Sequence, residues 1–166
     1  GIVDGYNGLG ALFYQTERFE KSREYFEKAL QISSELNLVK AKLTAFSSIA
    51  GVYVAENHYR EAIIYYEKAL DLAIQTGNVS STADQQINLG STYAKLSQFQ
   101  KADSLLIKAL SSKTQLNEKG GMANVYAELA QSAYRQFKST MAVGKEKQIK
   151  NAEKFGLKAF QIASEI

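Results

Sequence analysis

The sequence contains no cysteine, no proline and no tryptophan, and His58 is its only histidine. The absence of cysteine excludes disulfide bonds and thiolate zinc sites. His58 has no second histidine with which to share a metal ion, so we interpret it as a solvated turn residue. No apolar run approaches the ~18 residues of a membrane-spanning helix, and the first residues lack the apolar stretch of a secretory signal. The initiator methionine is also missing, and we interpret the chain as a segment of a longer protein.

The charge of the chain is mild but uneven. The composition, with 45% apolar and 22% charged residues, is typical of a globular domain, and the net charge is +3. Six lysines and two glutamates lie between Lys138 and Lys158, which gives this short segment an excess of positive charge. A nucleic-acid-binding protein usually has a broader basic stripe with interleaved aromatic residues. We therefore expect no nucleic acid, and we interpret the segment as solvated, with an acidic partner or an anionic membrane as the alternatives.

A tetrapeptide recurs along the chain at a constant interval of 40 residues. Glu27–Leu30 returns as Glu67–Leu70 and, with one change, as Ile107–Leu110. Large apolar residues recur at three- and four-residue steps before each copy, which is the period of an amphipathic helix. Short polar turns at 16–18, 56–58 and 97–98 divide each unit into two helices. Such hairpins cannot bury their apolar faces alone, so the period predicts that they stack.

The order of residues within each unit resembles the tetratricopeptide repeat. Each unit has an aromatic or polar residue, then Leu or Ile followed by Gly or Ala, as in Leu9-Gly10 and Leu89-Gly90. The first three units later have an Ala-Leu pair, such as Ala109-Leu110, whereas the fourth departs from the pattern and has Ala159-Phe160. The resemblance implies an all-α fold, a right-handed α-α superhelix (solenoid) of four helix hairpins. The expected repeats span 3–40, 43–78, 83–118 and 121–166, in a single domain. A period of 40 residues is typical of the long-repeat variety that occurs in bacterial regulator and sensor proteins.

Two departures from the family pattern lead to further expectations. Ser34, Ile74 and Thr114 stand where the family has proline, so the second helices can continue to about residues 36, 75 and 116. We expect left-handed helix ends at Gly77-Asn78 and Gly120-Gly121, and a helix start capped by Ser81. The fourth unit is ten residues too long between Leu110 and Phe160, which predicts an insertion near 138–148, as a loop between its helices.

The repeat also predicts which apolar residues are buried or exposed. Equivalent packing positions are occupied by Leu9, Ile49, Leu89 and Leu129, which we expect to be buried. The last helix ends with the apolar residues Phe160, Ile162 and Ile166. We expect these three to be exposed and to allow self-association through the C-terminal helix.

In the family that the chain resembles, the first helices of successive units line a concave groove. The resemblance and the helical spacing assign the following groove residues: Asn7, Tyr14, Gln15, Ser48, Asp84, Asn88, Ser91, Lys95, Asn124, Glu128, Gln131, Tyr134 and Arg135. Asn and Gln both donate and accept hydrogen bonds, which suits the backbone of an extended peptide. Lys95 or Arg135 would hold an acidic side chain. Each residue can equally be part of a solvated helix face, and the lysines of the 145–150 loop are a competing site.

These features favour a non-catalytic module that binds a protein or a peptide. The best interpretation is the sensory or docking segment of a larger bacterial signalling or regulatory protein, and the alternative is a structural scaffold for stable multiprotein assembly. No catalytic residue, metal or cofactor is expected, because no nucleophile with a base and no phosphate-binding loop is present. The clamp that some family members use for chaperone C-termini is not expected either, because its basic pair is missing. The corresponding places are occupied by Asn7, Ala11, Ser48, Asp84 and Asn88. A cytoplasmic location is favoured over a periplasmic one, and the segment has no means of membrane insertion.

Overall fold

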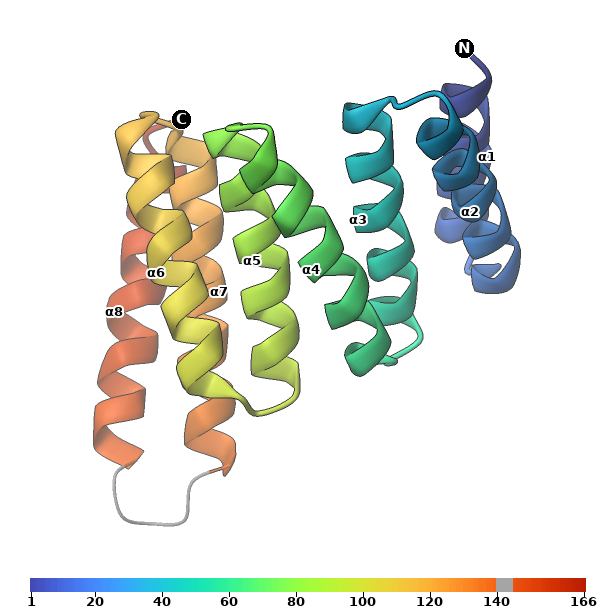
Figure 1. Ribbon diagram of the computed structural model, residues 1–166. Coiled ribbons are helices and arrows are strands. Elements are labelled where there is room, and N and C mark those ends of the chain that lie inside the picture. Colours follow the sequence, from blue (N-terminus) through green and yellow to red (C-terminus); the bar gives the residue numbers. More distant parts are fainter. Residues whose placement is uncertain (140–144) are drawn as a thin grey trace. The chain divides into compact units, whose positions relative to one another are not determined.

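Eight α-helices form the chain in this computed structural model, which describes residues 1–139 and 145–166 (Figure 1). The helices are α1 (Ile2–Gln15), α2 (Phe19–Glu35), α3 (Val39–Ala55), α4 (Tyr59–Gln75), α5 (Val79–Lys95), α6 (Phe99–Gln115), α7 (Lys119–Ser139) and α8 (Lys145–Ala163). The described residues include no strand. Helices α1 and α2, α3 and α4, α5 and α6, and α7 and α8 pack as pairs. The predicted all-α class with four helix hairpins is therefore confirmed.

The helix ends follow from residues that adopt a left-handed backbone. Glu17, Asn57 and Ser97 have positive φ within the first three hairpins. Between hairpins the same conformation is adopted by Asn37, Gly77 and Asn117, and the predicted end at Gly77 (φ 66°) is confirmed. Asparagine tolerates this region better than most residues because its short side chain bonds locally.

Two of the predicted helix boundaries are wrong. Gly120 and Gly121 lie inside α7, since Asn117 already supplies the left-handed residue after α6. The first turn of α5 is capped by Asn78, whose side-chain oxygen accepts a hydrogen bond from the Ser81 N–H at 2.9 Å. Asn78 therefore begins a helix rather than ending one, and Ser81 is not the cap.

The chain divides into two compact units, Gly1–Gly77 (unit 1) and Asn78–Ile166 (unit 2). Two clusters form the core of unit 1. Val3, Ala29 and Ala45 are buried where α1, α2 and α3 meet. Phe26, Ile49 and Val52 are buried between α2 and α3, with partly buried residues of α2, α3 and α4 packed against them. A Cβ added to Gly10 would lie 2.6 Å from the Phe26 ring, so only glycine allows this approach of α1 to α2. The Ser22 hydroxyl donates a hydrogen bond to the Gly10 carbonyl at 2.8 Å at the same place.

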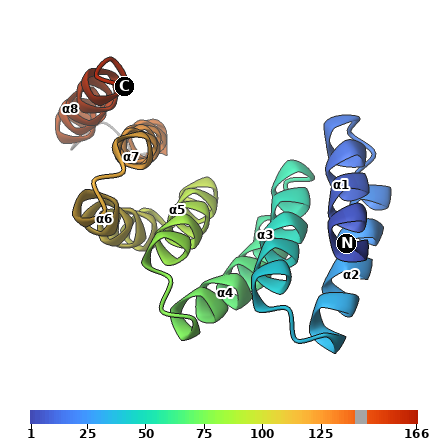
Figure 2. The same ribbon diagram turned by 90° about the horizontal axis from the view of Figure 1, so that it is seen from above.

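The core of unit 2 is continuous from α5 through α6 to α7. Leu106, Val125 and Leu129 are buried together with Ile87 and two alanines. The hydroxyl of Ser132, a buried residue of α7, donates a hydrogen bond to Asp103 of α6 at 2.8 Å. Helix α8 packs beside α7, as the two views in Figures 1 and 2 show. These contacts fix α5 and α7 as neighbours on one side of α6.

The predicted burial is right at three of the four packing positions. Ile49, Leu89 and Leu129 are at most 3% exposed, but Leu9 is 40% exposed. Among the described helices, α1 packs against α2 and α3, and Leu9 lies on a side of α1 that these two helices leave exposed. The expectation for the last helix is also partly wrong. Phe160 and Ile166 are each 75% exposed, whereas Ile162 is buried.

The ten extra residues of the fourth unit mostly lengthen its helices. Helices α7 and α8 have 21 and 19 residues, whereas each helix from α2 to α6 has 17. Lys138 and Ser139 belong to α7, and residues 145–148 belong to α8, so these parts of the predicted loop are helical. The remainder, residues 140–144, lies outside the described residues. Within the described part of the chain, no helix is both long and apolar enough to cross a membrane.

Candidate functional site

Helix α5 carries a narrow polar stripe between two buried sides. Ala83, Ile87, Leu89 and Thr92 are among its buried residues, and α5 packs against α6 and α7. Among the residues that stay exposed or half-buried, four polar ones recur at helical spacing: Asp84, Asn88, Ser91 and Lys95. Spacings of three and four residues place these side chains one above another along one face of the helix.

Helix α7 repeats this stripe 40 residues later. Its members are Asn124, Glu128, Gln131 and Arg135, all exposed or half-buried. Tyr134, which is 53% exposed, precedes Arg135 on the same helix. Because α5 and α7 contact each other, the two stripes and Tyr134 lie on neighbouring helices. We call these nine residues the polar face of unit 2.

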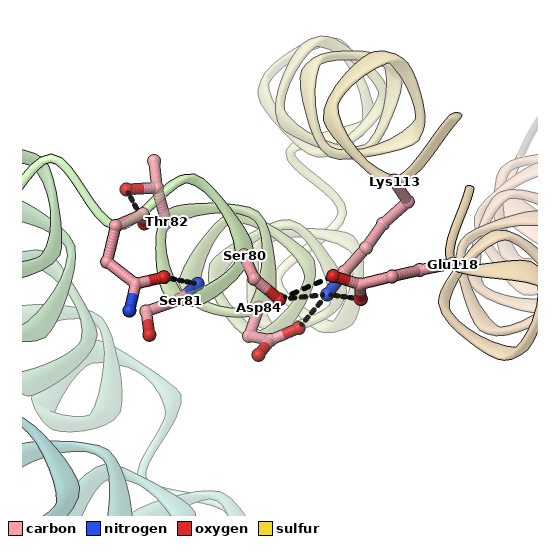
Figure 3. A network of polar contacts seen from close by, with 7 residues as sticks. Ser80, Ser81, Thr82, Asp84, Lys113 and Glu118 are labelled. Carbon is pink, nitrogen blue, oxygen red and sulfur yellow. Dashed lines mark hydrogen bonds and ion pairs between the residues drawn. The ribbon is translucent and has the colours of Figure 1, made fainter. Parts of the chain in front are cut away.

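At one end of the polar face, Asp84 is held by a buried lysine (Figure 3). The Lys113 side chain extends from α6, is 4% exposed, and places its ammonium nitrogen 2.6 Å from Asp84 Oδ1. The same nitrogen lies 2.6 Å from Glu118 Oε2, and it lies 3.2 Å from the hydroxyl of Ser80. Asp84 therefore has an intramolecular partner and is less available to a ligand than the sequence suggests.

The pKa shifts and the packing around Lys113 both fit a buried ammonium group that is paired with two carboxylates. Burial lowers the pKa of Lys113, but hydrogen bonds and charge attraction from Asp84 and Glu118 outweigh it and raise the pKa. The Lys113 ammonium and the Ser80 hydroxyl lower the pKa of Glu118. A Cβ on Gly121 would lie 2.7 Å from Lys113 Cδ, so the glycine in α7 makes room for the lysine stem. This explains Gly121, which the sequence had suggested as a helix end.

At the other end of the polar face, three cationic side chains line a pocket of about 290 Å³. Lys95 is the last residue of α5, and Arg135 and Lys138 lie on the last part of α7. The pocket is completed by Ala94, Ser97 and Ser139. Burial, with the nearby positive charge of Arg135, lowers the pKa of Lys95, and Glu128 opposes this shift. We call this site the cationic pocket.

The remaining predicted residues belong to unit 1. Asn7 lines a cavity of about 710 Å³ together with Asp4, Thr44 and residues 37–41, and its Oδ1 atom is buried without a hydrogen-bond partner. Tyr14 is 41% exposed and meets Phe19 edge-on, with ring centroids 5.9 Å apart. Gln15 is exposed and Ser48 is half-buried. These four residues are not joined by any hydrogen bond to one another in the described structure.

Two important residues of the site were missed by sequence reasoning. Lys138 was assigned to a loop, although its position three residues after Arg135 would have placed it on the same helix face. Lys113 gave no signal, because a lysine near the end of an amphipathic helix is normally solvated. His58 lies in its turn as expected, with a side chain that is 59% exposed. The described residues contain no cluster of His, Asp or Glu suited to a metal ion.

Comparison with known protein families agrees with the repeat seen in the fold. Family models for the tetratricopeptide repeat match residues 2–75 and 87–120, which together are more than half of the chain. The chain belongs to the tetratricopeptide repeat family. The second match ends inside the first turn of α7, and the helices of the fourth hairpin are the longest in the chain.

Several solved structures share this fold. The apo form of RapI is 20% identical with a TM-score of 0.81, and the match covers 98% of this chain and 56% of RapI. A Rap protein complexed with Competence and Sporulation Factor is 16% identical, with a TM-score of 0.71 and coverage of 95% and 44%. The TPR2AB domain of yeast Sti1, in its pHSP90 complex, is 15% identical, with a TM-score of 0.58 and coverage of 99% and 78%. The chain thus spans little more than half of RapI, and these identities show the fold alone. No curated protein matched.

Proposed function

We propose that this chain is a non-catalytic module that binds a peptide or an extended protein segment along the polar face of unit 2. We further propose that it is the sensory or docking segment of a larger bacterial signalling or regulatory protein. The observation that carries the proposal is the pair of equivalent polar stripes on neighbouring helices.

The chemistry of the stripes suits a polypeptide ligand. The amides of Asn88, Asn124 and Gln131 each offer a donor and an acceptor, which are what the N–H and C=O groups of an extended backbone require. Tyr134 adds a large exposed aromatic ring, a side-chain type that is enriched at binding interfaces. The two ends of the face differ, because the cationic pocket lies at one end and the Lys113 network lies at the other.

The comparisons support a polypeptide as the ligand. The structures named above include a Rap protein with Competence and Sporulation Factor and an Sti1 domain with pHSP90. Both are tetratricopeptide-like folds in complex with a partner. The bacterial signalling role rests on the 40-residue period, which this chain shares with the long-repeat regulators that it resembles.

Affinity capture from a lysate of the source organism tests the proposal. The wild-type chain, an Asn88→Ala/Gln131→Ala variant and a Lys108→Ala control are immobilised side by side, and the retained proteins are identified. Lys108 is an exposed residue of α6 that lies outside the polar face. We expect a partner that the wild type and the control retain and the polar-face variant loses. Equal retention by all three chains would contradict the proposal.

A further inference from the structure

The cavity of unit 1 lies at the repeat position that the Lys113 network occupies in unit 2. In unit 2 the buried Lys113 side chain ends beside Asp84 and Glu118 (Figure 3), and its stem lies against Gly121. The counterparts of these three neighbours, two repeats earlier in the sequence, all line the cavity: Asp4, Leu38 and Ala41. The cavity therefore corresponds to the space that a lysine side chain fills in unit 2.

Two differences in sequence distinguish this space in unit 1 from its counterpart in unit 2. The counterpart of Lys113 is Ser33, a buried residue whose hydroxyl donates a hydrogen bond to the backbone of its own helix at 3.0 Å. Serine has neither the aliphatic stem nor the ammonium group of lysine. The counterpart of Ile87, which is buried in the core of unit 2, is Asn7. The first difference removes a cation, and the second adds a polar side chain to the cavity wall.

The cavity keeps acceptors that suit an ammonium group. The Oδ1 atom of Asn7 is buried and has no hydrogen-bond partner among the described residues, which is costly for a polar atom. Asn7 as a whole is only half-buried, so its amide can turn toward a donor that enters the cavity. The Asp4 carboxylate already accepts a hydrogen bond from one ammonium group, the amino terminus of Gly1, at 2.7 Å. A carboxylate has sites for about four donors, so this bond leaves Asp4 able to accept another.

The rest of the lining offers apolar contact to an aliphatic stem. Leu38 and Val39 are exposed, and Ala41 lies in the first turn of α3 beside them. A ligand that covers these side chains gains from the burial of apolar surface. One basic residue, Lys40, also lines the cavity, but its side chain is exposed and can extend into solvent. A volume of about 710 Å³ lies in the range of sites that bind small molecules.

We propose that the cavity of unit 1 binds a primary ammonium group on an aliphatic stem, which is either a lysine side chain of a polypeptide or a free alkyl amine. The stem lies against Leu38 and Ala41, and the ammonium group donates hydrogen bonds to Asp4 and Asn7. The ligand thereby takes the place that Lys113 takes in unit 2. This site belongs to unit 1 alone and does not depend on the proposed function of the polar face.

A titration with butylamine, which has the stem and the ammonium group of lysine, tests the site. Amide chemical shifts of the wild type are followed by NMR, and 1-butanol serves as an uncharged ligand of the same length. We expect saturable shifts with butylamine at Asn7, Ala41 and Thr44. Binding of 1-butanol should be at least about tenfold weaker, because it lacks a charged hydrogen bond. Equal binding of the two ligands, or no shift at these residues, would overturn the proposal.

Variants test whether the carboxylate and the open space are responsible. Asp4→Asn should weaken butylamine binding about tenfold, whereas Asp71→Asn, the same change at an exposed residue of α4, should have no effect. Ser33→Lys/Ala41→Gly introduces the lysine and the glycine of unit 2, and it should abolish binding because the new side chain fills the cavity. Wild-type affinity in Asp4→Asn would contradict the proposal. This exposed change remains decisive if circular dichroism shows that the double variant is unfolded.

A lysine derivative distinguishes the two sources of the ammonium group. N-acetyl-lysine N-methylamide presents the same stem and charge on a peptide backbone. If it binds at least as tightly as butylamine, the cavity takes a lysine of a polypeptide. Clearly weaker binding than that of butylamine would identify a free amine as the ligand, because the backbone then does not fit. Binding of neither compound would refute the site.

Two controls separate the site from the amino terminus and from the polar face. A chain acetylated at Gly1 should bind butylamine at least as tightly as the wild type, because Asp4 then has no competing ammonium group. Weaker binding by the acetylated chain would contradict the proposal. The Asn88→Ala/Gln131→Ala variant should bind butylamine like the wild type, and a loss there would contradict a site confined to unit 1. If this variant retains every captured protein, the proposed function fails while the butylamine site stands.

Discussion

Replacing Lys113 distinguishes the two ways in which its network can stabilise unit 2. The side chain is buried against Gly121 and ends between Asp84 and Glu118. Lys113→Ala removes three buried methylene groups, each worth about 0.8 kcal/mol, so the packing loss alone is about 2 kcal/mol. Lys113→Met keeps most of this stem and removes only the charge. Because both carboxylates reach solvent, they can be hydrated again, and we expect Lys113→Met to lose less than about half as much stability.

Urea unfolding followed by far-UV circular dichroism measures both variants against the wild type. Since repeat proteins can unfold in stages, hydrogen exchange of the α6 and α7 amides should be measured as well, to assign the loss to unit 2. A control, Lys108→Ala, alters an exposed lysine of the same helix and should change the stability very little. If Lys113→Met destabilises as much as Lys113→Ala, the stabilisation comes from charge and the packing argument is wrong.

Three further predictions concern the core, the network and the last helix. Leu129→Ala should cost about 2–5 kcal/mol in urea unfolding because Leu129 is buried, whereas Leu9→Ala should cost much less, and equal losses would contradict the described burial. The pKa of Glu118 is lowered in the folded state from its ordinary value of 4.5. Its carboxylate therefore adds to the free energy of unfolding above pH 4.5, and this stabilisation is lost as the pH falls through the folded pKa. The stability of Lys113→Met should therefore fall less steeply in acid than that of the wild type, and parallel curves would refute this. We propose that exposed Phe160 mediates self-association. Light scattering at high concentration should then show a larger mass for the wild type than for Phe160→Ser, and a strict wild-type monomer would refute the proposal.

The hairpins were predictable because their signals repeat. The apolar spacing, the small residues and the polar turns recur every 40 residues, so each unit supports the assignment of the others. One of the two wrong boundaries lies where a residue has a tertiary role that the local sequence does not reveal. Gly121 reads as a helix end, but it is glycine because the stem of Lys113 occupies the space beside it.

The positions of the candidate residues on their helices were predictable, but the partners of their charges were not. Helical offsets placed Asn88 and Lys95 on one side of α5, since spacing alone decides which side chains share a helix side. The 40-residue repeat placed Arg135 at the equivalent position of α7. Spacing could not show that Asp84 already has a partner in Lys113, because that contact joins residues from two helices. Nor could it show that the extra residues lengthen α7 and bring Lys138 beside Arg135, because length alone does not distinguish a loop from a longer helix.

The central claim is that the polar face of unit 2, and not the basic first turns of α8, binds the polypeptide ligand. Fluorescence anisotropy with a labelled captured segment, or with a library-selected peptide, gives the dissociation constant for each variant. Arg135→Ala should weaken binding at least about tenfold, as expected for a lost hydrogen bond to a charged group. Asn88→Ala should also weaken it, while Lys147→Ala/Lys150→Ala should bind like the wild type. The claim is contradicted if the Lys147→Ala/Lys150→Ala variant loses binding while Asn88→Ala and Arg135→Ala retain wild-type affinity.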